Sequence, residues 1–269
     1  MASEMEELID FLSSPSPPVK KAAVDIVRGL TGSEDGLQSL EAHSEILLPS
    51  LEVSEPASEA LVNLSQNSNM AARMVSLGVV NTTMDILYKP DSSITKLLIM
   101  LLVNLTQLDA GVASLLQTKE EKVQGLYLMK LVRSFCRSTN DVSGTIRNCC
   151  FEAESQLQNL LLISEFLWPA LLLPVAGNKL YNEQDTSKMP LELGAALSIE
   201  REPVNDPEIR VQTLEAIYLI ALQIVHGSGT EELSTEIAKP SAEIAAHSTE
   251  VVMRPFVADS CDCFGPPLF

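Results

Sequence analysis

Aromatic side chains are scarce in this sequence, and that shortage bears on the fold. Only 4% of the 269 residues are Phe, Trp or Tyr, whereas 46% are hydrophobic. Leu and Ala favour helices, while sheets draw on aromatic and β-branched residues. We therefore expect an all-α protein with enough apolar side chain for a sizeable core.

Basic residues are also few. Eighteen Lys and Arg stand against 36 Asp and Glu, which gives a formal net charge of −18. A field of this sign repels nucleic-acid phosphates and anionic lipid headgroups. The apolar runs 94–105 and 157–176 do not predict membrane spans, because the first is too short and the second contains Glu165 and two prolines. We expect neither nucleic acid nor a membrane among the partners.

Cysteines are few and odd in number, and their spacing matches neither a zinc site nor a Cys-x-x-Cys redox motif. They are Cys136, Cys149, Cys150, Cys261 and Cys263. The first residues are acidic where a secretory signal would be basic. These features predict reduced thiols and a cytoplasmic protein.

Catalytic motifs are missing. The sequence has no Gly-rich phosphate loop with Lys, no His-Glu-x-x-His and no Gly-x-Ser-x-Gly. Its three histidines, His43, His226 and His247, are dispersed. We expect no enzyme and no catalytic, cofactor-binding or metal-binding residues.

A short segment recurs along the chain with constant internal spacing, which is the signature of a repeat architecture. Three copies are clear: VKKAAVDIVRGLT from Val19, VSEPASEALVNLS from Val53 and ITKLLIMLLVNLT from Ile94. Two looser copies begin at Ile146 and Ile209. Apolar residues at helical spacing within each copy predict a helix with one buried face. A stack of such helices predicts an armadillo/HEAT-like helical-repeat solenoid.

The domain organisation follows from this repeat. Residues 1–226 are predicted to form the armadillo-like domain, with an insertion loop at about 169–207 that holds one short helix over 191–197. Residues 227–269 have little helical periodicity, and we expect a disordered tail. Further helices are expected over 4–12, 37–47, 70–77, 80–87, 126–137 and 157–167. Trp168 and Pro169 are expected to end the last of these, with Trp168 as a core anchor.

The middle of the chain carries a more specific signal than the repeat. The stretches RNCCFE at 147–152, LLPVAG at 172–177 and MPLEL at 189–193 resemble the Hgh-type homologues, a family of eukaryotic armadillo-like proteins. The resemblance runs to about Gln223, after which the sequence diverges. Loss of the family's terminal helices would leave the apolar face of 209–224 exposed.

The resemblance, rather than the spacing, implies a function. It implies a chaperone cofactor that recognises incompletely folded translation elongation factor 2 and links it to the cytosolic chaperonin. The alternative is a general protein-interaction scaffold with a different client. The two differ in whether newly made or mature protein is preferred.

Two sets of residues are candidate protein-binding sites. Asn63 and Asn104 occupy matching repeat positions, where they contact either a ligand backbone or the turn at the end of a helix. Lys130, Arg133 and Arg137 fall on one helical face, which either meets an acidic partner or is simply solvated. Both alternatives stay open for each set.

Overall fold

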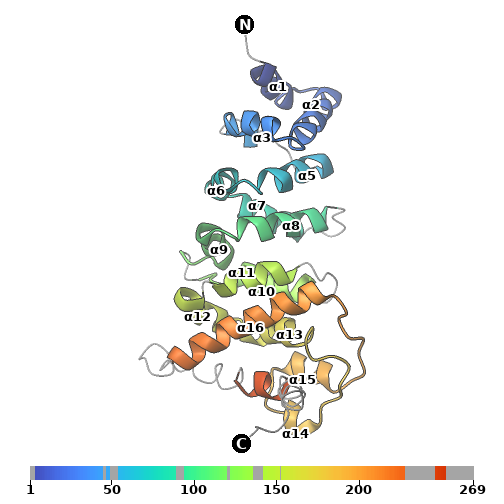
Figure 1. The fold of residues 1–269 in the computed structure, drawn as a ribbon, viewed down its shortest axis with the longest axis vertical. Helices are drawn as coiled ribbons and strands as arrows, with labels where there is room; N and C mark the ends of the chain where they lie inside the picture. The colour runs from blue at the N-terminus through green and yellow to red at the C-terminus, as the bar shows by residue number, and fades with distance from the viewer. Residues whose placement is uncertain are drawn as a thin grey trace, which may run out of the picture. The chain divides into compact units, whose positions relative to one another are not determined.

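The computed structural model describes residues 4–44, 47–48, 54–88, 94–119, 122–135, 142–151, 153–227 and 246–252. All regular elements in these ranges are helices (Figure 1). The chain divides into a first unit, Met1–Lys119, and a second unit, Glu120–Phe269. No helix among the described residues is long and apolar enough to span a membrane. The predicted all-α, helical-repeat class is confirmed.

The first unit contains the three clear repeat copies. They form α2 (Pro17–Leu30), α5 (Glu55–Leu64) and α8 (Thr95–Leu105), and α5 packs against both α2 and α8 (Figure 1). Between them lie the other helices of the unit: α1 (Glu4–Leu12), α3 (Glu34–Glu41), α6 (Ser68–Ser76), α7 (Val79–Leu87) and α9 (Asp109–Leu116).

Local sequence explains where several of these helices begin. Ser33 and Asn67 are N-caps whose side-chain oxygens accept backbone N–H bonds from the first turn of α3 and α6. Proline occupies the first turn of α2 and of α5, where no backbone donor is lost. Each repeat helix then buries one apolar face, with Val27, Leu64 and Leu102 fully buried.

Helix α9 has no counterpart among the predicted helices. Its third residue, Gly111, lies so close to the end of α8 that an added Cβ would stand 2.0 Å from the carbonyl oxygen of Leu105. Glycine has a low helix propensity, so Gly111 argues against a helix in the sequence. The same residue allows α9 to pack against the end of α8, because it has no side chain.

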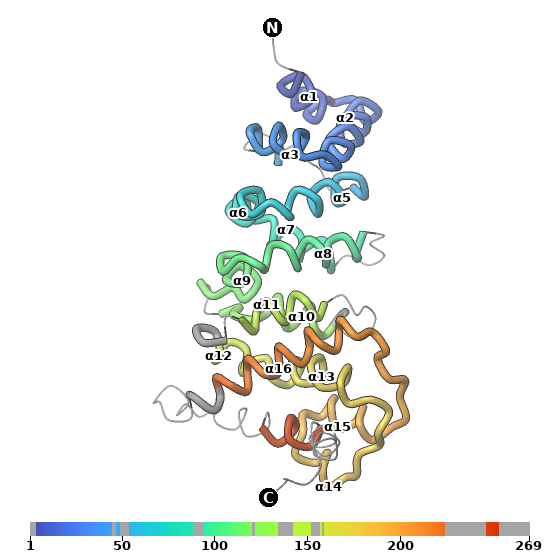
Figure 2. Tube along the Cα trace, in the orientation of Figure 1, coloured from blue at the N-terminus to red at the C-terminus, as the bar shows by residue number. Residues whose placement is uncertain are grey.

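The second unit contains the two looser copies. The copy that begins at Ile146 forms most of α11 (Ser143–Phe151) and the beginning of the helix after it, and the copy that begins at Ile209 lies in α16 (Pro207–Gly227). Helices α11 and α16 pack side by side although a long insertion separates them in the sequence (Figures 1 and 2). The other helices are α10 (Leu126–Phe135), α12 (Ala153–Leu162), α13 (Ser164–Leu172), α14 (Glu183–Thr186) and α15 (Leu191–Leu197).

The structure differs from the sequence predictions at α13. This helix continues through Pro169 to Leu172, whereas the proline was expected to end it. An internal proline costs about 3 kcal/mol because a backbone hydrogen bond is lost. Burial of Leu167, Trp168, Leu171 and Leu172, each worth about 1.5–3 kcal/mol, outweighs that cost.

The insertion is more ordered than a loop. It holds α14 as well as the expected α15, and the backbone N–H of Tyr181 donates to the carbonyl of Leu197 at 3.0 Å. Within the tail, residues 246–252 are helical. Val252 is fully buried there, and the Nε2 atom of His247 lies 3.0 Å from the carbonyl oxygen of Asp185. The prediction of disorder does not describe this segment, and the rest of the tail lies outside the described residues.

Candidate protein-binding surfaces

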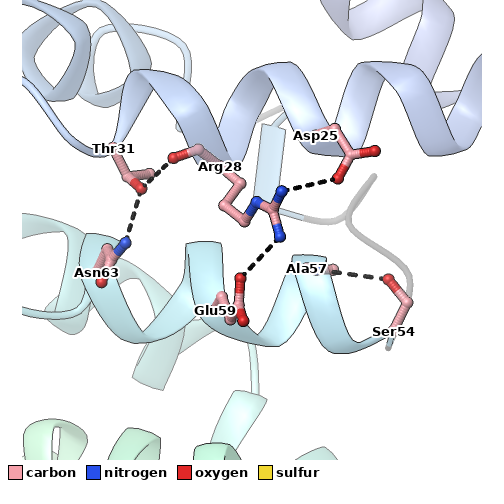
Figure 3. Close-up of polar contacts among 7 residues, drawn as sticks. All are labelled: Asp25, Arg28, Thr31, Ser54, Ala57, Glu59 and Asn63. Atoms are coloured by element: carbon pink, nitrogen blue, oxygen red, sulfur yellow. Dashed lines mark hydrogen bonds and ion pairs between the residues drawn. The ribbon is translucent and has the colours of Figure 1, made fainter.

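Asn63 and Asn104 make the same kind of contact in successive repeats. The Nδ2 group of Asn63 donates to the hydroxyl of Thr31 at 2.9 Å, and that hydroxyl donates to the carbonyl of Arg28 at 2.7 Å (Figure 3). One repeat later, Nδ2 of Asn104 donates to the hydroxyl of Ser65 at 2.9 Å. The structure therefore confirms the repeat register on which the two asparagines were matched.

These bonds bear on the role of the two asparagines. Asn104 also donates to the carbonyl of Val62 at 3.2 Å, so its amide group joins α8 to the end of α5. Asn63 joins α5 to the end of α2 in the same way. The geometry favours the interpretation of both as bonds between repeat helices. Contact with a ligand backbone stays a prediction.

The basic stripe is only partly within the described residues. Arg137 lies outside them, and Lys130 is half-buried on α10. Arg133 is exposed, and its Cζ atom stands 5.6 Å from the centre of the Phe166 ring on α13. No carboxylate in the described part of the chain forms an ion pair with Arg133. Its guanidinium group is thus a cation available to a partner.

A pocket of about 230 Å³ lies beside Arg133. We call it the α10–α13–α15 pocket, after the helices that form it together with the segment 199–204. Its walls are mostly apolar, and its charged lining residues are Arg133, Arg201, Glu192 and Glu202. It joins the predicted basic stripe to the insertion.

Arg201 holds one wall of this pocket in place. Its Nη2 atom donates to the carbonyls of Lys179 at 2.7 Å and of Ala176 at 3.3 Å, while Nη1 lies 3.5 Å from carbonyls at the end of α15. Burial lowers the pKa of the Arg201 guanidinium, and the nearby Tyr181 hydroxyl acts in the opposite direction. Arg201 is engaged by the backbone, which leaves Arg133 as the freer cation at the pocket.

A second exposed surface lies on α16. Val211 and Tyr218 are 54% and 64% exposed and stand two turns apart on this helix. The prediction that the apolar face of 209–224 is exposed is wrong, because Ile209, Ile217 and Ile220 are buried where α16 packs against α11, α12 and α13. Val211 and Tyr218 lie on the opposite side of the helix.

The two cysteines among the described residues lie in the core. Cys149 and Cys150 are fully buried, and burial raises the pKa of the Cys149 thiol to about 12. Within the described ranges, no group of His, Cys, Asp and Glu is placed to hold a metal ion. Cys136, Cys261 and Cys263 lie outside those ranges.

The amino-acid sequence is similar to those of known proteins. Residues 140–211, from α11 to the start of α16, match a family model described as a domain of unknown function, DUF383. The chain is 30% identical over 229 residues to "Protein HGH1 homolog" of Xenopus tropicalis, covering 79% of this chain and 63% of the relative. The Hgh-type resemblance is confirmed.

Other HGH1 homologues show how far this similarity extends. The protein of Xenopus laevis is 27% identical over 87% of this chain and 70% of its own length. The HGH1 homologue of Dictyostelium discoideum is 20% identical over 81% of this chain and 78% of its own length. The chain thus spans less than two thirds of the Xenopus tropicalis relative and somewhat more of these two.

Solved structures support the fold alone. The crystal structure of an engineered protein has a TM-score of 0.59 at 15% identity, covering 94% of this chain and 98% of its own. A second engineered protein has a TM-score of 0.50 at 17% identity, covering 91% of this chain and 67% of its own. At such identities the fold is shared, and nothing follows about function.

Proposed function

We propose that this chain is a protein-binding adaptor that helps translation elongation factor 2 to fold together with the cytosolic chaperonin. The observation that carries the proposal is its similarity to HGH1 homologues over 79% of its length, on a helical-repeat fold. The client and the chaperonin come from the resemblance to that family. The proposal places the protein in the cytoplasm and gives it no enzymatic activity.

The surfaces of the molecule are compatible with this role. A client that has not finished folding exposes apolar side chains, so its partner needs apolar surface as well as charge. The second unit offers both, in the α10–α13–α15 pocket beside Arg133 and in Val211 and Tyr218 on α16.

A scaffold for a different client is the second candidate. Sequence identity to the HGH1 homologues is only 20–34%, which leaves room for different surface residues on the same helices. An adaptor for folding should prefer a newly made client, whereas a scaffold should bind the mature protein equally well.

Capture from a eukaryotic translation extract tests the proposal. The immobilised chain is offered newly made and mature elongation factor 2 in parallel, and the bound material is probed for the factor and for the chaperonin. We expect preferential capture of the newly made factor with the chaperonin. Equal capture of both forms would contradict the folding role and favour a scaffold. Capture of neither, by a chain shown to be folded by circular dichroism, would contradict elongation factor 2 as the client and leave the scaffold for a different client.

A further inference from the structure

We propose that the α10–α13–α15 pocket binds an extended polypeptide segment through one apolar side chain, and that Arg133 binds a carboxylate next to that side chain. This inference rests on the proposed function only in treating the occupant as a client protein. It adds the binding face and the chemistry of the recognised segment.

The size and lining of the pocket point to an apolar side chain. At about 230 Å³ it is smaller than the roughly 300–1,000 Å³ of pockets that enclose drug-sized ligands. Phe166, Ala170, Leu173 and Ile199 are among its apolar lining residues, and Ile199 is 62% exposed. Burying one side chain of the client there would also remove part of this exposed apolar surface from water.

The charges at the pocket point to a carboxylate beside that side chain. Arg133 lies over Phe166, at 5.6 Å from the ring centre, and has no ion-pair partner among the described residues. Arg201 already donates to backbone carbonyls. The planar guanidinium of Arg133 is suited to bidentate bonding with a carboxylate. Because Glu192 and Glu202 also line the pocket, a strongly acidic segment is disfavoured, and one carboxylate fits best.

The test uses the full chain and a synthetic probe. The probe is a short peptide with one phenylalanine followed by one aspartate in a Gly/Ser background, and its counterpart has asparagine in place of the aspartate. Methyl NMR follows the signal of Ile199 at the pocket while peptide is added, because this method detects weak binding. We expect saturable shifts at Ile199, with affinity up to about fivefold lower for the asparagine peptide.

Matched variants locate the binding site. Ala196→Trp fills the pocket from α15, whereas Ala195→Trp places the same side chain on the exposed neighbouring position. Arg133→Glu reverses the charge at the pocket, whereas Arg210→Glu does so at an exposed position outside it. We expect Ala196→Trp to abolish the shifts and Arg133→Glu to remove the preference for aspartate, with both controls unchanged. Circular dichroism establishes that each variant is folded.

Several outcomes would overturn the inference: equal affinity for the two peptides, shifts that leave Ile199 unaffected, or a shift that depends on protein concentration alone, which would indicate a second copy of the chain. The two proposals fail separately. If the Ala196→Trp variant captures newly made elongation factor 2 as well as the unmodified chain does, the pocket is not the client-binding site, and the proposed adaptor role is unaffected. If the peptide binds at the pocket but no elongation factor 2 is captured, the pocket is a binding site and elongation factor 2 is not the client.

Discussion

The first unit joins its repeat helices by regular polar bonds, whereas the second unit relies on individual contacts. In the first, Asn63 and Asn104 donate to hydroxyls at the same position of the preceding repeat. In the second, Arg147 pairs with Glu215 between α11 and α16, and Arg201 bonds the carbonyls of the insertion. The first unit therefore shows the polar bonds by which successive repeat helices stack. The second unit contains the α10–α13–α15 pocket, which we propose binds a partner.

A substitution at the close contact between α8 and α9 in the first unit should have the largest effect on stability. Gly111→Ala would bring a Cβ to 2.0 Å from the carbonyl oxygen of Leu105, so α8 and α9 would have to move apart. We expect a loss of about 1–3 kcal/mol in the free energy of unfolding, measured by urea denaturation. Gly29→Ala is the matched control, because nothing lies within 4 Å of its added Cβ in α2. It should stabilise the chain by about 0.5–1 kcal/mol, and equal effects of the two would contradict the packing described for α9.

The repeated asparagine bonds should have the next largest effect. Asn104→Ala removes donors to Ser65 and Val62 and should cost about 1–2 kcal/mol, while Asn63→Ala removes one donor to Thr31 and should cost about 1 kcal/mol. Urea denaturation measures both. Capture of elongation factor 2 by the folded variants then separates the two interpretations. Weakened capture without a loss of stability would return both residues to the role of ligand contacts.

The buried thiol of Cys149 makes the free energy of unfolding depend on pH. An unfolded Cys149 ionises near pH 9.0, whereas the folded thiol keeps its proton until about pH 12. The unfolded chain therefore binds fewer protons between these values, and stability is full below pH 9 and falls above it. The contribution of Cys149 falls by about 1.4 kcal/mol per pH unit in this window. Chemical denaturation at pH 8, 9 and 10 should show a steeper loss for the unmodified chain than for Cys149→Ala. If both proteins lose stability equally as the pH rises, groups other than Cys149 determine the pH dependence of unfolding.

The sequence predicted the repeat well because its signal is local. Val19, Val53 and Ile94 each open a segment with apolar residues at helical spacing, and all three segments became helices. The register of Asn63 against Asn104 followed from the same spacing. Local signals failed at Pro169 and at Gly111, where tertiary packing outweighs the intrinsic preference of the residue.

The pocket could be predicted only in part, for a related reason. Arg133 was found because it belongs to a basic helical stripe, which is visible within a few residues of sequence. Phe166 joins it because α13 packs against α10, and Ile199 and Arg201 join it through the folding of the insertion. No spacing rule connects residues so far apart, so the combination of a cation with an apolar pocket needed the structure.

The ion pair of the second unit should have the smallest effect, and it tests whether individual contacts there are worth more than those of the first unit. Arg147 pairs with Glu215 and lies 4.7 Å from the centre of the Phe151 ring, whereas the more exposed Arg28 pairs with Glu59 at 3.0 Å and Asp25 at 3.4 Å. Partly exposed pairs are worth about 0.2–1 kcal/mol, and the aromatic contact adds about 0.5 kcal/mol.

Double-mutant cycles with Arg147→Gln and Glu215→Gln, and with Arg28→Gln and Glu59→Gln, measure the two couplings at low and high salt. We expect both couplings to weaken with salt. The single change Arg147→Gln should cost more than Arg28→Gln, because it also loses the contact with Phe151. The reverse order would mean that the regular first unit gains more from its surface charges than the second unit does.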